Sequence, residues 1–143
     1  LRELAALDLP APRPVAARYR RDGPLYRADL LTVELPSRTT LAQALVSDPL
    51  PMQRWSDIGR CIGRFHAHGV RHADLNANNI VLGPAREVYL LDFDRGRIVA
   101  RGAWEDVVLA RLERSLVKVT QALPAGRYGP EQWQLLLDAC RRA

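Results

Sequence analysis

Residues 72–79, with the sequence HADLNANN, combine a carboxylate and an amide that suit phosphoryl transfer. Asp74 can accept the proton of an acceptor hydroxyl, and Asn79 follows five residues later on the same segment. An apolar strand ends at Asp92 soon afterwards. Phosphoryl transfer needs an oriented acceptor and metal-neutralised phosphate charge, and Mg²⁺ prefers such oxygen ligands. We therefore predict Asp74 as the catalytic base, Asn79 and Asp92 as Mg²⁺ ligands, and His72 as a brace for the loop.

A long helix is expected to precede this loop. Trp55, Ile58, Ile62 and Phe65 are spaced three or four apart, so a helix over 52–68 would bury them as one core stripe. Further elements are bounded by glycine, proline or other turn residues. They are a polar loop over 70–79, strands over 80–82 and 88–93, and helices over 104–123 and 130–142.

The N-terminal part of the chain predicts a helix tail and a β-hairpin. Repeated prolines after the helix tail remove backbone donors and end it. An Asp-Gly pair is a hairpin turn signal, and threonine is a favoured helix cap. In chain order we expect a helix tail over 1–7, strands over 15–20 and 25–35 joined at Asp22 and Gly23, and a short helix to Val46 capped by Thr39 or Thr40.

The order of these elements resembles the protein-kinase-like fold, in which the base and the amide lie five apart and the metal aspartate ends the next ribbon. We predict an α+β chain with a mainly helical C-lobe and a hinge hairpin, and with the N-lobe largely absent. Residues 1–36 would be a remnant of the N-lobe and hinge, and residues 37–143 the catalytic C-lobe. Glu34 and Leu35 fall at the predicted hinge, where backbone groups would bind adenine.

Five segments together resemble the 3-deoxy-D-manno-octulosonic acid (Kdo) kinase family, and the resemblance extends from about Leu9 to Lys118. They are Pro12–Tyr19, Tyr26–Leu30, His72–Asn76, Leu91–Gly96 and Arg111–Leu116. The resemblance implies ATP-dependent phosphorylation of a hydroxyl of the Kdo residue on a lipid A precursor, in lipopolysaccharide core biosynthesis. Because that acceptor is linked to a lipid, it also implies peripheral association with the anionic cytoplasmic face of the bacterial inner membrane.

Several arginines near the predicted site have two interpretations. Arg95 can recognise a carboxylate or phosphate of the acceptor, or it can pair with Asp94 or Glu87. For Arg71 and Arg97 we favour structural pairing.

Two other groups of residues have alternative interpretations. Arg18, Arg20 and Arg21 form a basic cluster, for which a solvated edge strand is the default and membrane contact the alternative. For His66 and His68 we expect solvent-facing positions at the end of a helix, and not a histidine metal site with His72.

The chain departs from a complete kinase pattern in one respect. A kinase fold needs a glycine-rich loop and a strand lysine over the phosphates, and no glycine-rich loop precedes the hairpin. Lys118, the only lysine, comes after the metal site on a predicted helix, where we expect it to be solvated. Glu3 is a weak candidate for the glutamate that would pair with such a lysine. We expect these 143 residues to be a fragment with little activity by themselves.

Composition narrows the remaining functional classes. The net charge of +5 favours an anionic partner, but no aromatic-basic interleaving or groove-binding motif indicates nucleic acid. Cys61 and Cys140 lie far apart without metal-type spacing and are expected to be reduced packing residues. Two alternatives to a Kdo kinase stay open. One is a small-molecule phosphotransferase of the aminoglycoside type, and the other is a non-catalytic kinase-like remnant.

Overall fold

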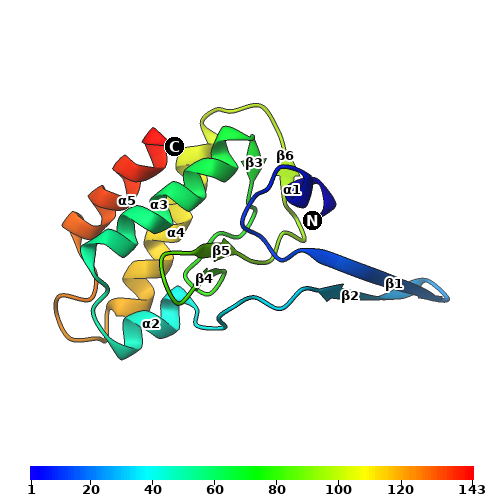
Figure 1. Ribbon diagram of the computed structural model, residues 1–143, viewed down its shortest axis with the longest axis horizontal. Coiled ribbons are helices and arrows are strands. Elements are labelled where there is room, and N and C mark those ends of the chain that lie inside the picture. Colours follow the sequence, from blue (N-terminus) through cyan, green and yellow to red (C-terminus); the bar gives the residue numbers. More distant parts are fainter.

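The computed structural model describes residues 1–143, except for the side chains of Asp22 and Tyr26. These residues form a helical body with small antiparallel sheets on one side and a slender β-hairpin that projects away from it (Figure 1). The mixture of helices and small sheets confirms the predicted α+β class. The assignment of the body as a kinase C-lobe and the division at residue 36 remain predictions. None of the helices in this described part is both long and apolar enough to span a membrane.

Helix α3 (Met52–Ala67) is the centre of the body and packs along α5 (Pro130–Arg142). The predicted core stripe is confirmed, since Trp55 and its three partners are at most 1% exposed. Two glycines of α3 let the helices approach closely. A Cβ at Gly59 would lie 2.2 Å from the Leu136 carbonyl oxygen, and one at Gly63 would lie 2.4 Å from that of Cys140. A side chain at either position would force α3 and α5 apart.

Helix α2 (Leu41–Ser47) begins with a capping box at Thr40. The Thr40 hydroxyl accepts from the Gln43 backbone N–H at 3.2 Å, and the Gln43 side chain accepts from the Thr40 N–H at 2.9 Å. Backbone N–H groups at the start of the helix are thereby hydrogen-bonded, as a threonine cap predicts. Its first turn also contacts residues 72–79, which we call the candidate loop, because the Ala42 N–H donates to the Ala77 carbonyl at 3.0 Å.

The N-terminal elements are α1 (Arg2–Ala6) and the hairpin of β1 (Pro14–Asp22) and β2 (Leu25–Thr32). Gly23 adopts a left-handed φ of +59° in the hairpin turn, as the Asp-Gly signal predicts. Strand β2 ends three residues before the predicted Leu35, so residues 33–36 are free to form the connector to the body.

Two other ribbons lie close to the candidate loop. Strands β4 (Ile80–Leu82) and β5 (Val88–Leu90) form the predicted one, but β5 ends before residue 93 because Asp92 has a φ of +60°. The second pairs β3 (Val70–Arg71) with β6 (Arg97–Ile98) and was not predicted, since residues 70–79 were expected to be loop throughout. Strands of two residues have no periodic pattern, so only the tertiary structure creates them.

Helix α4 (Trp104–Thr120) completes the body. Its buried face holds Val108, Leu109, Leu112 and Leu116, while Lys118 is exposed as expected. Both cysteines are free and buried, which confirms their packing role. Burial raises the pKa of the Cys61 thiol to about 12, so this group is unreactive at neutral pH.

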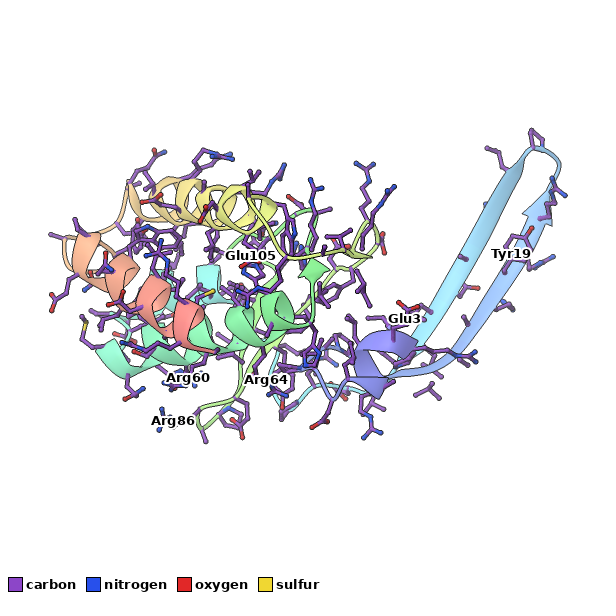
Figure 2. The ribbon with its side chains drawn as sticks, turned by 90° about the horizontal axis from the view of Figure 1, so that it is seen from above. Glu3, Tyr19, Arg60, Arg64, Arg86 and Glu105 are labelled. Atoms are coloured by element: carbon purple, nitrogen blue, oxygen red, sulfur yellow. The ribbon has the colours of Figure 1, made fainter. Side chains whose placement is uncertain are left out.

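A buried carboxylate, Asp57, fastens the β4–β5 turn to α3. Its side chain is 4% exposed and accepts from Arg86 Nη2 at 2.6 Å, with a further ion pair to Arg60 (Figure 2 labels both arginines). Arg54 reinforces the attachment by donating to the Ala85 and Gly83 carbonyl oxygens at 2.8 and 3.0 Å. Burial alone would raise the pKa of Asp57, but the hydrogen bonds and charges of the arginines lower it overall.

We expect Asp57→Asn to lower the free energy of unfolding at pH 7 by about 1–3 kcal/mol, because charge-assisted hydrogen bonds are lost from a buried group. A depressed carboxyl pKa stabilises the fold above its unfolded value, and this contribution is lost as the pH falls. The difference between wild type and variant should therefore shrink below about pH 4. Chemical denaturation at pH 7 and at lower pH measures the free energy of unfolding of both proteins. The exposed Asp48→Asn is the control. A variant as stable as wild type at pH 7 would contradict the role of Asp57.

Candidate active site

His72 ties the candidate loop to the segment that carries Asp92. The Asp74 backbone N–H donates to His72 Nδ1 at 3.1 Å, so the ring proton must be on Nε2. Nε2 then donates to the Leu91 carbonyl oxygen at 2.7 Å. Burial lowers the pKa of His72, which favours the neutral ring that this pair of hydrogen bonds requires. The geometry is the one that a bracing role for His72 would need.

Aromatic packing holds the ring from the side. The centroid of Phe93 is 4.8 Å from that of His72 and 5.3 Å from that of Phe65, which belongs to the core stripe of α3. Phe93 therefore packs between the core residue Phe65 and the loop residue His72.

Two asparagines shape the loop around the Asp74 carbonyl. The Nδ2 groups of Asn76 and Asn79 each donate to this oxygen at 2.9 Å. Asn76 Oδ1 also accepts from the Asn78 N–H at 2.9 Å. In the part of the chain that the structure describes, no group donates to Asn79 Oδ1. The amide of Asn79 is thus oriented by its nitrogen and presents an unused oxygen.

Helix α4 contributes two contacts that the sequence did not reveal. Arg111 Nη1 pairs with Asp74 Oδ1, and the Ser115 hydroxyl accepts from the Ala77 N–H at 3.1 Å. The two residues are four apart and therefore share one face of the helix. This i, i+4 polar pair beside the apolar stripe is the signal from which the contact could have been inferred. The helix thus positions both the acid and the second half of the loop.

The structure brings three of the predicted site residues into one cavity of about 460 Å³. Asp74, Asp92 and Arg95 line it together with Ala73, Asp94 and Arg111. The left-handed φ of Asp92 is a conformation that costs energy for a residue with a Cβ, and it turns the chain out of the β5 direction immediately before Phe93. Asn79 does not line this cavity but is joined to it through the Asp74 carbonyl.

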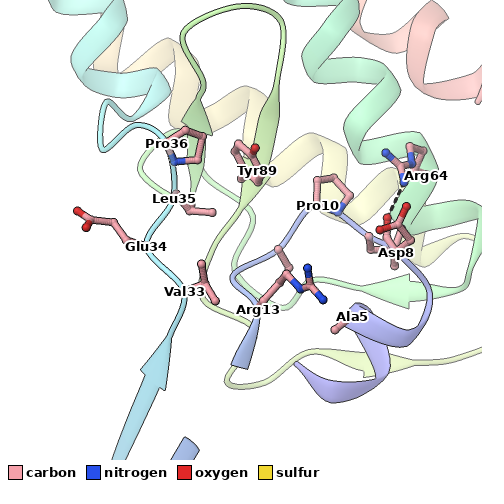
Figure 3. A pocket seen from close by; sticks show the side chains of 12 residues that line it. Ala5, Asp8, Pro10, Arg13, Val33, Glu34, Leu35, Pro36, Arg64 and Tyr89 are labelled. Carbon is pink, nitrogen blue, oxygen red and sulfur yellow. Dashed lines mark hydrogen bonds between the residues drawn. The ribbon is translucent and has the colours of Figure 1, made fainter. Parts of the chain in front are cut away.

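Glu34 and Leu35 lie at a different cavity, of about 400 Å³ (Figure 3). It is bounded by the connector on one side and by residues 8–13 on the other, with Tyr89 and Arg64 at its border. Glu34 pairs with the exposed Arg38. Neither Asp74 nor Asp92 lines this space. The predicted adenine contacts are therefore apart from the cavity that these aspartates line, which we call the acidic cavity.

A third cavity, of about 640 Å³, shares Asp92 and Asp94 with the cavity of Asp74. Asp92, Phe93 and Asp94 form one wall, and the base of the β1–β2 hairpin forms the other. This space places the predicted metal aspartate opposite the hairpin.

The expected pairing of Arg71 and Arg97 with Asp94 or Glu87 is wrong. Among the side chains that the structure describes, neither arginine has an ion pair, and the same holds for Arg95. Glu87 lies instead on the β4–β5 turn, where its carboxylate accepts from the Ala85 N–H at 3.1 Å. Ribbon β3–β6 and the β4–β5 turn are separate structures, which the sequence did not show.

The basic cluster of Arg18, Arg20 and Arg21 is exposed on the β1–β2 hairpin. Arg18 pairs with Asp29 across the hairpin at 2.8 Å, with both side chains exposed. Such exposure is common to a solvated edge strand and to one that contacts a membrane, so both interpretations stay predictions.

The expectation for His66 is wrong, because its side chain is buried and not at the surface. The ring packs edge-on against Trp104 with centroids 5.1 Å apart, and Nδ1 is 3.9 Å from both Cys140 Sγ and Glu105 Oε2. The start of α4 and the end of α5 cover this face of α3. His68 is exposed as expected, and no group of three or more His, Cys, Asp or Glu side chains in the described part could hold a metal.

We expect the fold to lose stability as the pH falls below about 6.5, because the unfolded chain binds protons that buried neutral His72 excludes. His72→Gln can keep both hydrogen bonds without titrating. The loss in free energy of unfolding between pH 7 and pH 5 should therefore be about 1 kcal/mol smaller in this variant. Denaturant titrations at both pH values provide the measurement. His68→Gln should retain the full loss, and identical profiles for His72→Gln and wild type would count against the neutral ring.

Comparisons with known proteins show the family of this chain. The lipopolysaccharide kinase (Kdo/WaaP) family matches residues 1–139. Relatives named 3-deoxy-D-manno-octulosonic acid kinase occur in Xylella fastidiosa (strain M12), 45% identical over 120 residues, and in Xanthomonas campestris pv. campestris (strain B100), 44% identical over 122. A third, from Stenotrophomonas maltophilia (strain K279a), is 44% identical over 121 residues.

Each alignment covers 83% of this chain and 48% of the relative, so the chain spans about half the length of the curated relatives it matches. The match to the family, in contrast, extends over nearly the whole chain and includes the loop, the acidic cavity and the helix that positions them. The chain therefore belongs to the lipopolysaccharide kinase (Kdo/WaaP) family.

Proposed function

We propose that this chain carries the catalytic residues of a kinase that transfers a phosphoryl group from ATP to a hydroxyl of the Kdo residue on a lipid A precursor. The observation that supports this most is the shared cavity of Asp74 and Asp92, with the loop between them braced by His72. Relatives that cover most of the chain are named for kinase action on 3-deoxy-D-manno-octulosonic acid.

Asp74 is the proposed base. Its carboxylate is about half exposed, so an acceptor hydroxyl can reach it from the cavity. Arg111 holds Oδ1, and the Asn76 amide is 3.3 Å from Oδ2. These contacts fix the direction of the carboxylate while leaving lone pairs available for a hydroxyl proton. Arg111 is in this account a positioning residue, because it acts through Asp74.

Asn79 and Asp92 are the proposed ligands of Mg²⁺. Asn79 Oδ1 has no described donor, and the Asp92 carboxylate has no ion pair among the described side chains. Two free oxygen ligands of this kind fit Mg²⁺, which usually takes its remaining ligands from water and phosphate. The bound ion would neutralise phosphate charge. Backbone groups of Glu34 and Leu35 are proposed to contact adenine.

The acceptor and its location belong to the same proposal. A lipid-linked acceptor would bring the protein to the anionic cytoplasmic face of the inner membrane as a peripheral protein. Arg95, which lines the cavity beside Asp74, is the proposed contact to an acidic group of this acceptor.

The decisive test measures phosphate transfer from ATP to a Kdo-bearing lipid A precursor. It uses both the 143-residue chain and the longest reading frame that contains it. We expect transfer by the longer form and little by these residues alone, because they contain neither a glycine-rich loop nor a strand lysine. Asp74→Asn should lower kcat by about 10²–10⁴-fold while leaving the fold intact.

Asp48→Asn, an exposed carboxylate on the far end of α2, is the matched control and should retain full turnover. Retained turnover in Asp74→Asn would remove this residue from the role of base. Transfer to a soluble aminoglycoside in place of the Kdo acceptor would favour the small-molecule alternative. Absence of any transfer by the longer form would favour a non-catalytic remnant.

A further inference from the structure

One end of the β3–β6 ribbon lies next to the candidate active site, where β3 ends and β6 begins. Arg71 is the last residue of β3 and precedes the loop of His72 and Asp74. Arg97 is the first residue of β6 and follows the turn in which the Gly96 N–H donates to the Phe93 carbonyl at 2.9 Å. The two arginines therefore lie at the end of the ribbon nearest to the acidic cavity.

Arg71 and Arg97 are directly opposite each other in this antiparallel pair. Residues opposite each other in a ribbon extend their side chains to the same face, with Cβ atoms about 5 Å apart. Like charges in this arrangement repel and destabilise the pair. Both arrangements occur in the β1–β2 hairpin, where Arg18 stands opposite Asp29 and forms an ion pair, whereas Arg20 stands opposite Arg27.

No carboxylate in the described part forms an ion pair with Arg71 or Arg97. Glu3 and Arg97 both border a small cavity of about 130 Å³, but they form no ion pair, and Asp94 pairs with neither arginine. Arg95, two residues before Arg97, is also without an ion pair and lines the cavity of Asp74. Three exposed arginines without ion pairs thus lie beside the site, and we call Arg71, Arg95 and Arg97 the arginine fork.

The fork lies within reach of an acceptor bound at Asp74. Arg71 precedes Asp74 by three positions, so their Cα atoms are at most about 11 Å apart. A monosaccharide and an arginine side chain together span that distance. Arginine offers paired N–H donors in a plane, which match the two oxygens of a carboxylate.

We propose that the arginine fork is a binding site for the carboxylate of a sugar-acid acceptor, and that Arg71 and Arg97 make its principal contacts. This inference rests on the proposed function, since the relatives' names supply the acceptor as an octulosonic acid. It extends that function by assigning the acid group to a specific place, the end of β3–β6. The fork then selects acidic sugars, and the bound carboxylate offsets the repulsion between the opposed arginines.

The test measures binding and not turnover, so that it stands apart from the kinase assay. Calorimetry on the full chain compares 3-deoxy-D-manno-octulosonic acid with its methyl ester, which is neutral at the same position. We expect the acid to bind roughly tenfold more tightly than the ester. The double variant Arg71→Gln/Arg97→Gln should lose this preference and keep the affinity for the ester.

The matched control is Arg20→Gln/Arg27→Gln. These two arginines are also directly opposite each other, but they lie on the β1–β2 hairpin that projects from the body (Figure 1). The control removes the same charge from the same kind of position and should retain the full preference for the acid. A loss of preference in the control as well would show a general effect of net charge and would overturn the proposal.

Other outcomes also decide the matter. Equal affinity for acid and ester, a preference that survives in the double variant, or no binding of the acid at millimolar concentrations would overturn the proposal. Displacement of the acid by inorganic phosphate more readily than by acetate would assign the fork to a phosphate group and overturn the carboxylate assignment. Fork-dependent binding without any phosphate transfer by the longest reading frame would reject the proposed function alone, whereas transfer without acid preference would reject the fork alone.

Discussion

The neutral imidazole of His72 is the constraint on which the rest of the site depends. One ring nitrogen accepts from the Asp74 backbone, and the other donates to the carbonyl of Leu91, immediately before Asp92. A single buried side chain therefore sets the distance between the loop of the candidate base and the strand of the candidate metal ligand. A charged ring could not accept from the backbone of Asp74, so the connection depends on burial, which lowers the pKa of the histidine. Phe93 and the core stripe of α3 supply that burial.

The remainder of the body keeps this connection from moving. Gly59 and Gly63 let α5 lie against α3, and the ion pair of Asp57 with Arg86 holds the β4–β5 ribbon to the same helix. Helix α4 approaches from the other direction, with Arg111 on the Asp74 carboxylate and Ser115 on the loop backbone. The loop is thus attached directly to two helices, α4 and, through Ala77, α2, and it is attached through His72 to the segment that follows β5. Such support lets polar side chains keep one orientation without being deeply buried.

Charged groups of both signs lie around the site. Away from it, some arginines have carboxylate partners, as with Arg18 and Arg86, and others, such as Arg20 and Arg27, have none among the described side chains. At the acidic cavity Arg111 is paired, but the arginine fork is not, although three aspartates lie close by. Asp92 and Asp94, which have no arginine partner among the described side chains, remain available to a cation, and the unpaired arginines remain available to an anion. This separation is what a site for a metal–phosphate complex and an acidic acceptor would require.

Several local features of this protein follow from its sequence. The apolar stripe of α3, the Asp74–Asn79 spacing and a cap at Thr39 or Thr40 could be predicted, because each depends on residues within a few positions of one another. Asp92 belongs to a later segment and was predicted from its place at the end of an apolar strand. Strand β5 was predicted too long, since the left-handed conformation of Asp92 has no pattern in the sequence. The β3–β6 ribbon, the contact of Arg111 with Asp74 and the burial of His66 depend instead on the tertiary structure. Each of these joins segments that are far apart in the chain, and their partners are chosen by how the helices pack and not by local propensity.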